Sequence, residues 1–187
     1  MDLLLSPFVA PLVLIAAAVL AARQPGRRPK GVPRLAEAAA LVALLLAGIG
    51  LLRLLIDGPT SMAIGSDAAL LALRLDAVSA TMALLVAFVG WVVVRYARRY
   101  LDGEAREGAF HALMLATLAA VLVLVQAGSL AVLGAGFIAA GLGLRSLLLF
   151  YPDRTEARRA ALKFSLVWGA GDVALIAAAV LLWAAFG

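Results

Sequence analysis

The sequence predicts an all-α integral membrane protein: one domain, residues 1–187, folded as a bundle of six transmembrane helices. Composition is the first reason, because 65% of the residues are hydrophobic, 14% are charged and the mean hydropathy is +1.08. Such a chain has little room for a soluble domain. The second reason is that the apolar residues gather into six runs separated by short polar segments, as expected of helices that cross a bilayer.

The first two apolar runs cover approximately residues 3–22 and 35–55. The N-terminus lacks the basic region and the clear cleavage site of a signal peptide, so we expect the first helix to be retained. It ends in RQPGRRPKGVPR, where Pro and Gly stop the helix. Residues 56–76 contain turn signals and then the alternating stretch LALRLD, which predicts either a short strand or an interfacial segment.

The remaining runs cover residues of about 77–96, 110–125, 130–150 and 160–186. Asp76 and Ser79 stand where the third helix begins, a pattern typical of an N-terminal cap. The fifth run is rich in glycine, which suits close packing against other helices. Its spaced glycines are Gly134, Gly136, Gly141 and Gly143.

The basic residues sit in short loops between the apolar runs, so the net charge of +5 indicates orientation rather than nucleic-acid binding. The loops after the first, third and fifth runs, with the adjoining Arg145 and Lys163, hold all of the 16 Lys and Arg except Arg53 and Arg74. The positive-inside rule therefore predicts three cytoplasmic loops and both termini outside the cytoplasm. We expect the membrane to be the cell inner (plasma) membrane.

Asp172, near the middle of the sixth run, is the main candidate functional residue. An ionised carboxylate at that depth costs roughly 2.5 to 3.5 kcal/mol on insertion scales, so it should face protein or water, with a partner, or be held protonated. Gly169 and Gly171 flank it and favour close approach of another helix. We expect Asp172 to exchange or gate a proton or cation; the alternative is a protonated acid in a structural hydrogen bond.

Two basic residues complete the predicted ion path, Lys163 and Arg145. Lys163 lies about 13 Å along the helix from Asp172 and about half a turn around it, so these two side chains should point to opposite faces. A lysine at this depth can also simply reach the cytoplasmic surface. Arg145 is an anchor of the same kind, a partner for Asp172 on the next helix, or a replacement for a lost polar group.

Other charged residues have ordinary explanations. Glu37 opens the second helix, where the N-terminus favours negative charge. For His111, at the start of the fourth run, we favour a solvated helix-end residue over a pH-sensitive relay. Residues 95–100, RYARRY, resemble an interfacial belt of basic and aromatic side chains.

An enzymatic function has no support of its own in this sequence. The chain has no cysteine and one histidine, and it shows no glycine-rich phosphate loop, no paired nucleophile and base, and no metal-ligand spacing. We therefore predict no cofactor and no metal held by this chain. A membrane-embedded enzyme stays the third hypothesis, after a transporter subunit and a structural subunit.

From residue 75 onward the chain resembles the antiporter-like membrane subunits related to subunit L of NADH:quinone oxidoreductase. The resemblance rests on LDAVS at 75–79, RYARRY at 95–100, the glycine-rich fifth run, and Lys163 followed by Gly171 and Asp172. Residues 137–154 are most similar to the membrane subunit of the DAB inorganic-carbon accumulation complex, with FYPDR at 150–154 as the most specific piece.

This resemblance implies a subunit that moves protons or sodium ions through intramembrane acids and lysines, with Asp172 and Lys163 at positions that the family keeps polar. It also implies a cytoplasmic, zinc-containing partner similar to carbonic anhydrase that hydrates carbon dioxide. Two departures matter. Phe137 and Ile138 stand where respiratory members have a Trp-Glu pair, and Arg145 stands where inorganic-carbon members tend to carry His.

Family members contain two inverted five-helix repeats, and by this resemblance the chain stops three helices into the first repeat. We expect it to be a fragment, one half of a split gene product, or a degenerate paralogue with a scaffolding role. The leading hypothesis is a cation-translocating subunit, or part of one, of an inorganic-carbon complex. Its rival is a non-conducting structural subunit of a complex I-like or cation/proton antiporter assembly.

Overall fold

The structure, a computed structural model, describes residues 8–64, 71–151 and 153–186. Five of the described helices are long and apolar enough to cross a membrane, and a shorter apolar helix precedes them. The predicted all-α membrane bundle is confirmed, with a small β-hairpin added. In chain order the elements are α1 (Val9–Ala22), α2 (Val32–Asp57), β1 (Thr60–Ile64), β2 (Leu71–Leu75), α3 (Ala77–Tyr100), α4 (Glu107–Val125), α5 (Leu130–Leu148) and α6 (Thr155–Phe186).

Several helices extend past the predicted apolar runs. α2 begins at residue 32 rather than 35, α3 continues to 100 rather than 96, α4 begins at 107 rather than 110, and α6 begins at 155 rather than 160. Apolar runs mark the part of a helix that suits a bilayer core, whereas backbone hydrogen bonding continues into charged turns beyond it. α5 instead ends at 148, two residues early. Residues 3–7 of the first predicted run lie outside the described residues.

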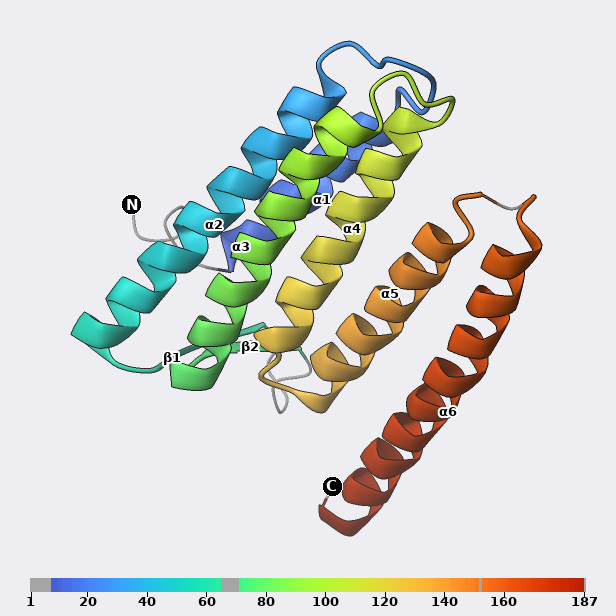
Figure 1. Cartoon of the computed structure of the whole chain (residues 1–187). Helices are drawn as coiled ribbons and strands as arrows, with labels where there is room; N and C mark the ends of the chain where they lie inside the picture. The colour runs from blue at the N-terminus through green and yellow to red at the C-terminus, as the bar shows by residue number, and fades with distance from the viewer. Residues whose placement is uncertain (1–7, 65–70, 152, 187) are drawn as a thin grey trace.

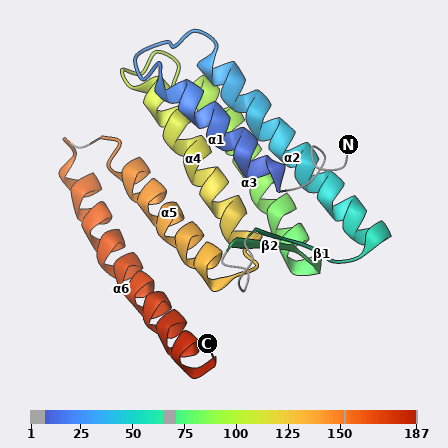
Figure 2. The same ribbon diagram turned by 180° about the vertical axis from the view of Figure 1, so that it is seen from behind.

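α1 to α4 form a four-helix bundle, and α5 and α6 extend it on one side (Figure 1). α1 packs against α2 and α4, and α3 packs against the same two helices. α5 packs on α4, and α6 packs on the far side of α5 (Figure 2). α6 is therefore the edge helix of the described chain.

The core of this bundle is built from alanine with a few leucines. Leu14, Leu115 and Leu122 are fully buried among alanines of all four helices. Small side chains let helix backbones approach closely, and such contact is what holds helices together in lipid. The buried alanines of this cluster include Ala10, Ala17, Ala36, Ala40, Ala43, Ala83, Ala87 and Ala119.

At one end, which we call the basic end, the segments 23–31 and 101–106 lie together (Figure 1). Arg28 Nε lies 3.4 Å from Asp102 Oδ1, and the Gly108 amide donates to the Gly26 carbonyl oxygen at 3.3 Å. A Cβ atom at Gly108 would lie 1.8 Å from the Gln24 carbonyl oxygen, so only glycine lets the first loop rest on α4 here.

At the opposite end, which we call the hairpin end, β1 and β2 pair antiparallel with Thr60 opposite Leu75. Of the two possibilities for LALRLD, the strand is correct for Leu71–Leu75. The second edge of β2 pairs with the α4–α5 turn, because the Arg74 amide donates to Gln126 O and the Gly128 amide donates to Ala72 O, both at 2.8 Å.

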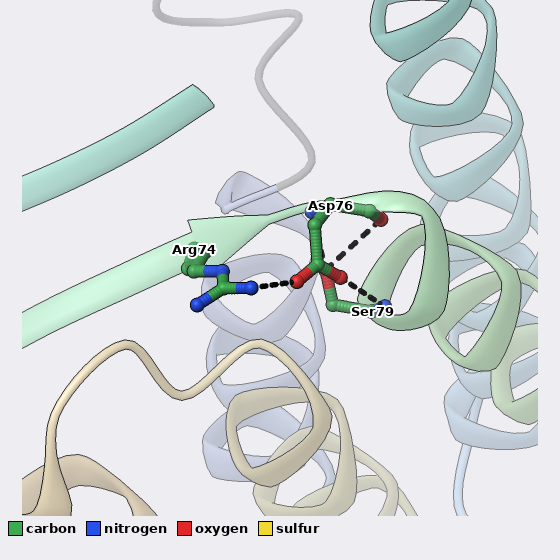
Figure 3. A network of polar contacts seen from close by, with 3 residues as sticks. All are labelled: Arg74, Asp76 and Ser79. Atoms are coloured by element: carbon green, nitrogen blue, oxygen red, sulfur yellow. Dashed lines mark hydrogen bonds and ion pairs between the residues drawn. The ribbon is translucent and has the colours of Figure 1, made fainter. Parts of the chain in front are cut away.

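The predicted cap of α3 is confirmed as a reciprocal capping box (Figure 3). The Ser79 amide donates to Asp76 Oδ1 at 2.8 Å, and the Asp76 amide donates to Ser79 Oγ at 2.7 Å. The Arg74 guanidinium pairs with the other Asp76 carboxylate oxygen. The Ser79 amide first, and then Arg74, lower the pKa of Asp76 from its ordinary value.

Candidate functional site

A small cavity of about 170 Å³ lies between α5 and α6 and contains the two most informative predicted site residues, Asp172 and Arg145. Its α6 wall runs from Phe164 to Asp172, a helix rise of about 12 Å. α5 runs the opposite way, so Arg145 in its last turn lies toward the Phe164 end. The full lining is Ile138, Gly141, Leu142, Arg145, Phe164, Ser165, Trp168, Gly169 and Asp172.

Asp172 is partly buried, and its Oδ1 atom is buried without a hydrogen-bond partner among the described residues. A buried polar atom that lacks a partner is costly, and such an atom at a helix interface marks a place where a proton, ion or further group belongs. Asp172 is therefore the described carboxyl group in this cavity whose buried oxygen has no partner among the described residues.

Arg145 lines the same cavity, but no ion pair joins it to Asp172 in the part of the chain that the structure describes. The guanidinium is on an exposed residue in the last turn of α5, where a positive charge also complements the helix dipole. Arg145 and Asp172 therefore occupy opposite ends of one elongated cavity.

Lys163 is not part of this cavity. It is exposed on α6 and is absent from the lining residues, in line with the half turn that separates it from Asp172. The structure thus brings together two of the three predicted path residues and leaves Lys163 on another face. Its role in an ion path stays a prediction.

Trp168 shapes the cavity and was missed by sequence reasoning. Its ring stacks on Phe137 at a centroid distance of 4.5 Å and on Phe164 at 5.1 Å, and its indole N–H donates to the Phe137 carbonyl oxygen at 3.3 Å. A Cβ at Gly141 would lie 2.2 Å from Trp168 Nε1, so this glycine makes room for the indole. The available signal was helical spacing, because Trp168 precedes Asp172 by four residues.

Only some of the spaced glycines act as predicted. Added Cβ atoms at Gly136 and Gly143 would meet Leu124 and Thr117, so these glycines do allow α5 to approach α4. Gly134 and Gly169 face open space within the described chain, and Gly171 meets only the Phe137 ring at 3.5 Å. The expected close approach of a helix at Gly169 does not occur within the described residues.

The interpretation of Glu37 as a helix-start charge was wrong. α2 begins at Val32, so Glu37 lies one turn further in and pairs with Arg98 and, at 3.9 Å, with Arg95 Nε. Arg95 also stacks over the Trp91 ring at 5.4 Å. Arg95 and Arg98 at the end of α3 therefore link α3 to α2, and the interfacial role of residues 95–100 stays a prediction.

The interpretation of His111 as a solvated helix-end residue was also wrong. His111 is fully buried, and neither ring nitrogen has a hydrogen-bond partner among the described residues. α4 begins one turn earlier than predicted and the 23–31 loop covers this turn, which puts His111 inside the bundle. Glu107, one turn before it, is 2% exposed and accepts from the Gly103 amide at 3.1 Å.

Gln126 is a further buried polar residue, and its burial was not predicted from the sequence. It is 1% exposed and its side-chain oxygen lacks a partner among the described residues. Its position in the α4–α5 turn looked like an ordinary polar connection. No group of three or more His, Cys, Asp or Glu side chains suited to a metal ion occurs within residues 8–64, 71–151 and 153–186.

Comparison with known proteins finds one family and several membrane subunits to which part of the chain is similar. Residues 62–111 match the family described as NADH-Ubiquinone oxidoreductase (complex I), chain 5 N-terminus. A "Probable inorganic carbon transporter subunit DabB2" of Halothiobacillus neapolitanus is 35% identical over 125 residues, 67% of this chain and 23% of that protein. The matched part of the chain is similar to these membrane subunits.

Two further relatives show the same similarity. The NADH-ubiquinone oxidoreductase chain 5 of Metridium senile is 28% identical over 115 residues, 62% of this chain and 19% of that protein. A "Probable inorganic carbon transporter subunit DabB" of Hydrogenovibrio crunogenus is 31% identical over 100 residues, 53% of this chain and 19% of that protein. The chain spans less than a quarter of the length of each of these curated relatives.

The resemblance to antiporter-like subunits is confirmed for the matched part of the chain. Together with the apolar helices it supports a multi-pass membrane protein. The segment matched by the family covers the hairpin, α3 and the first residues of α4. It ends before the cavity residues of α5 and α6. At the position where respiratory members were expected to carry a Trp-Glu pair, Phe137 stacks on Trp168 and Ile138 lines the cavity.

Proposed function

We propose that the chain is a proton- or sodium-translocating membrane subunit, or part of one, in an inorganic-carbon accumulation complex of the cell inner membrane. One observation carries the proposal: Asp172 presents a buried, unpartnered carboxylate oxygen to a cavity that also contains Arg145. Two relatives are named as probable inorganic carbon transporter subunits, which supports that branch of the family over a respiratory one.

In this proposal Asp172 is the exchange group. An uncompensated carboxylate away from water is costly, so Asp172 takes up a proton on an Oδ atom or holds a cation beside it. Arg145 supplies a fixed positive charge at the other end of the cavity, which favours release of the proton or cation and return of the carboxylate. Lys163, on the outer face of α6, would serve a neighbouring subunit or the cytoplasmic mouth.

The proposed orientation has the basic connections in the cytoplasm. The loops after α1, α3 and α5 all lie toward the same end of the molecule, which supports this assignment (Figure 1). The partner would be a zinc-containing, carbonic-anhydrase-like cytoplasmic protein that consumes the cation gradient to drive hydration of carbon dioxide. Such a partner would supply the zinc ion, and this chain would supply the path of the cation across the membrane.

A second candidate function is a non-conducting structural subunit, and the apolar surface of α6 favours it. A groove of about 520 Å³ between α5 and α6 is lined only by apolar residues and glycine, among them Leu130, Ile176 and Val180. Under this alternative the groove binds another membrane helix and Asp172 makes a structural hydrogen bond.

The decisive experiment compares Asp172→Asn with Asp153→Asn, a matched loss of one exposed carboxylate outside the helices. The tagged chain is recovered from native membranes, its co-purifying proteins are identified and assayed for zinc, and cation flux is followed in vesicles of the same membranes. We expect Asp172→Asn to lower flux by about ten-fold or more with unchanged partners, as for loss of a proton-transfer group.

Asp153→Asn should leave both flux and partners as in the parent chain. If Asp172→Asn keeps the flux and the partners, the carboxyl group is structural and the second candidate function stands. Recovery of respiratory or antiporter subunits without zinc would move the chain to one of those complexes.

A further inference from the structure

A polar cavity of about 460 Å³ lies at the basic end and shares no lining residue with the α5–α6 cavity. It is formed where the start of α2, the end of α3 and the start of α4 meet. Its lining residues are Gly31, Pro33, Arg34, Arg98, Arg99, Asp102 and Glu107. Three guanidinium groups and two carboxyl groups therefore face one space.

The carboxyl groups of this cavity are already engaged. Asp102 pairs with Arg28 from outside the lining, and Glu107 accepts a hydrogen bond from the Gly103 amide. Arg98 is held by Glu37. That leaves two guanidinium groups, on Arg34 and Arg99, for which the described residues supply no carboxylate.

Arg34 has a further reason to bind an anion. It lies in the first turn of α2, a 26-residue helix whose N-cap, Gly31, has no side chain to accept from the free backbone amides. A positive side chain at the positive end of a helix dipole is unfavourable unless an anion lies beside it. The cavity thus combines two unpaired guanidinium groups with an uncapped helix start.

The surroundings of the cavity are those of a membrane interface. Tyr96 and Tyr100, in the last turns of α3, are exposed and stack on one another with centroids 5.5 Å apart. Val92 and Val93, one to two turns earlier in α3, are exposed apolar residues of a helix that is long and apolar enough to cross a membrane. Tyrosine at this depth is typical of the headgroup layer, and the apolar surface below it suits acyl chains.

We propose that Arg34, Arg98 and Arg99 form a binding site for the phosphodiester headgroup of an anionic phospholipid. The phosphate oxygens would accept from Arg34 and Arg99, while Arg98, fixed by Glu37, presents its remaining N–H groups. The acyl chains would lie along the exposed apolar face of α3 below the tyrosines. This site is independent of the proposed ion path.

The test uses the full chain purified in a neutral detergent. Binding of phosphatidylglycerol is measured by native mass spectrometry and by the shift in unfolding midpoint, with phosphatidylcholine and inorganic phosphate as separate arms. The variant is Arg34→Gln with Arg99→Gln. The control is Arg27→Gln with Lys30→Gln, which removes the same charge from the neighbouring loop but not from the cavity.

We expect phosphatidylglycerol to stabilise the parent and control chains, and to bind the Arg34/Arg99 variant about ten- to a hundred-fold more weakly, as for loss of two charge-assisted contacts. If the double variant does not fold, the single variants Arg34→Gln and Arg99→Gln carry the comparison. Equal binding by variant and parent would overturn the site. Equal stabilisation by inorganic phosphate, or by phosphatidylcholine, would overturn its assignment to an anionic lipid.

Discussion

The four-helix bundle of α1 to α4 and the pair α5–α6 differ in how much each helix is covered. In α2 and α4, 33% of the most apolar 18-residue stretch is buried, whereas in α6 none of it is. α2 contacts α1, α3 and α4, but α6 packs chiefly on α5. The helices of the bundle are therefore packed by one another. The edge helix α6, which carries the candidate exchange site, has one face that no described helix covers.

This difference in burial distinguishes the bundle, which acts as a scaffold, from the α5–α6 pair, which contains the candidate site. Close alanine packing gives the bundle a fixed shape, and α5 joins that shape through Gly136 and Gly143. α6 packs on α5, and one contact between them is the stacking of Trp168 on Phe137 next to the cavity. An exchange group on a lightly packed helix can change its surroundings without disturbing the bundle.

The largest expected effect on the free energy of unfolding comes from truncating a leucine in the bundle, compared with the same truncation in α6. Leu115→Ala, at a fully buried position of α4, should lower the free energy of unfolding in detergent by about 2 to 5 kcal/mol, because a cavity replaces packed atoms. Leu181→Ala, at a 69% exposed position of α6, should change it by less than about 0.5 kcal/mol. Equal losses at both positions would show that α6 is packed as tightly as the bundle.

A smaller loss of unfolding free energy is expected at Gly108, and it tests one specific contact between the 23–31 loop and α4. Gly108→Ala should destabilise the chain by about 1 to 3 kcal/mol, because the new Cβ must displace the Gln24 backbone rather than a flexible side chain. The matched control is Gly134→Ala on α5, where a Cβ meets nothing within 4 Å. In the same unfolding titration the control should be neutral or stabilised by up to about 1 kcal/mol. A neutral Gly108→Ala would mean that the 23–31 loop does not rest on α4.

The smallest expected effect is at the α3 cap. Asp76→Ala should cost about 1 kcal/mol at neutral pH by removing the acceptor of the Ser79 amide. Because the folded-state pKa of Asp76 lies below its unfolded value, its contribution is complete above the unfolded pKa and is lost as the pH falls through the folded pKa. The stability difference between parent and variant should shrink below a pH of about 4. A difference independent of pH would show that the carboxylate charge does not contribute.

The elements of the fold could be predicted from the sequence because each depends on local pattern. Apolar runs predicted the helices, alternation at 71–75 predicted a possible strand, and Asp76 with Ser79 predicted the cap. Helix ends were missed by several residues because charged turns continue the helical hydrogen bonds after hydrophobicity has stopped. The partner of Glu37 was missed because Arg98 is 61 residues away along the chain.

The candidate site was predictable only in part. Asp172 stood out because a carboxyl group in an apolar run is costly wherever the helix packs. That Arg145 shares its cavity, while Lys163 does not, depends on how α5 and α6 face one another. The burial of His111 depends on a loop that folds back over α4, for which the clearest local sign was Gly108.

The pairing of β2 with the α4–α5 turn also places a condition on insertion of the chain into a membrane. Arg74 and Ala72 on the outer edge of β2 have their backbone partners in Gln126 and Gly128. The chain must therefore thread α3 to one side of the membrane and α4 back again before this edge is covered. The hairpin end is complete only when both helices are in place and have brought the α4–α5 turn back to the level of β2.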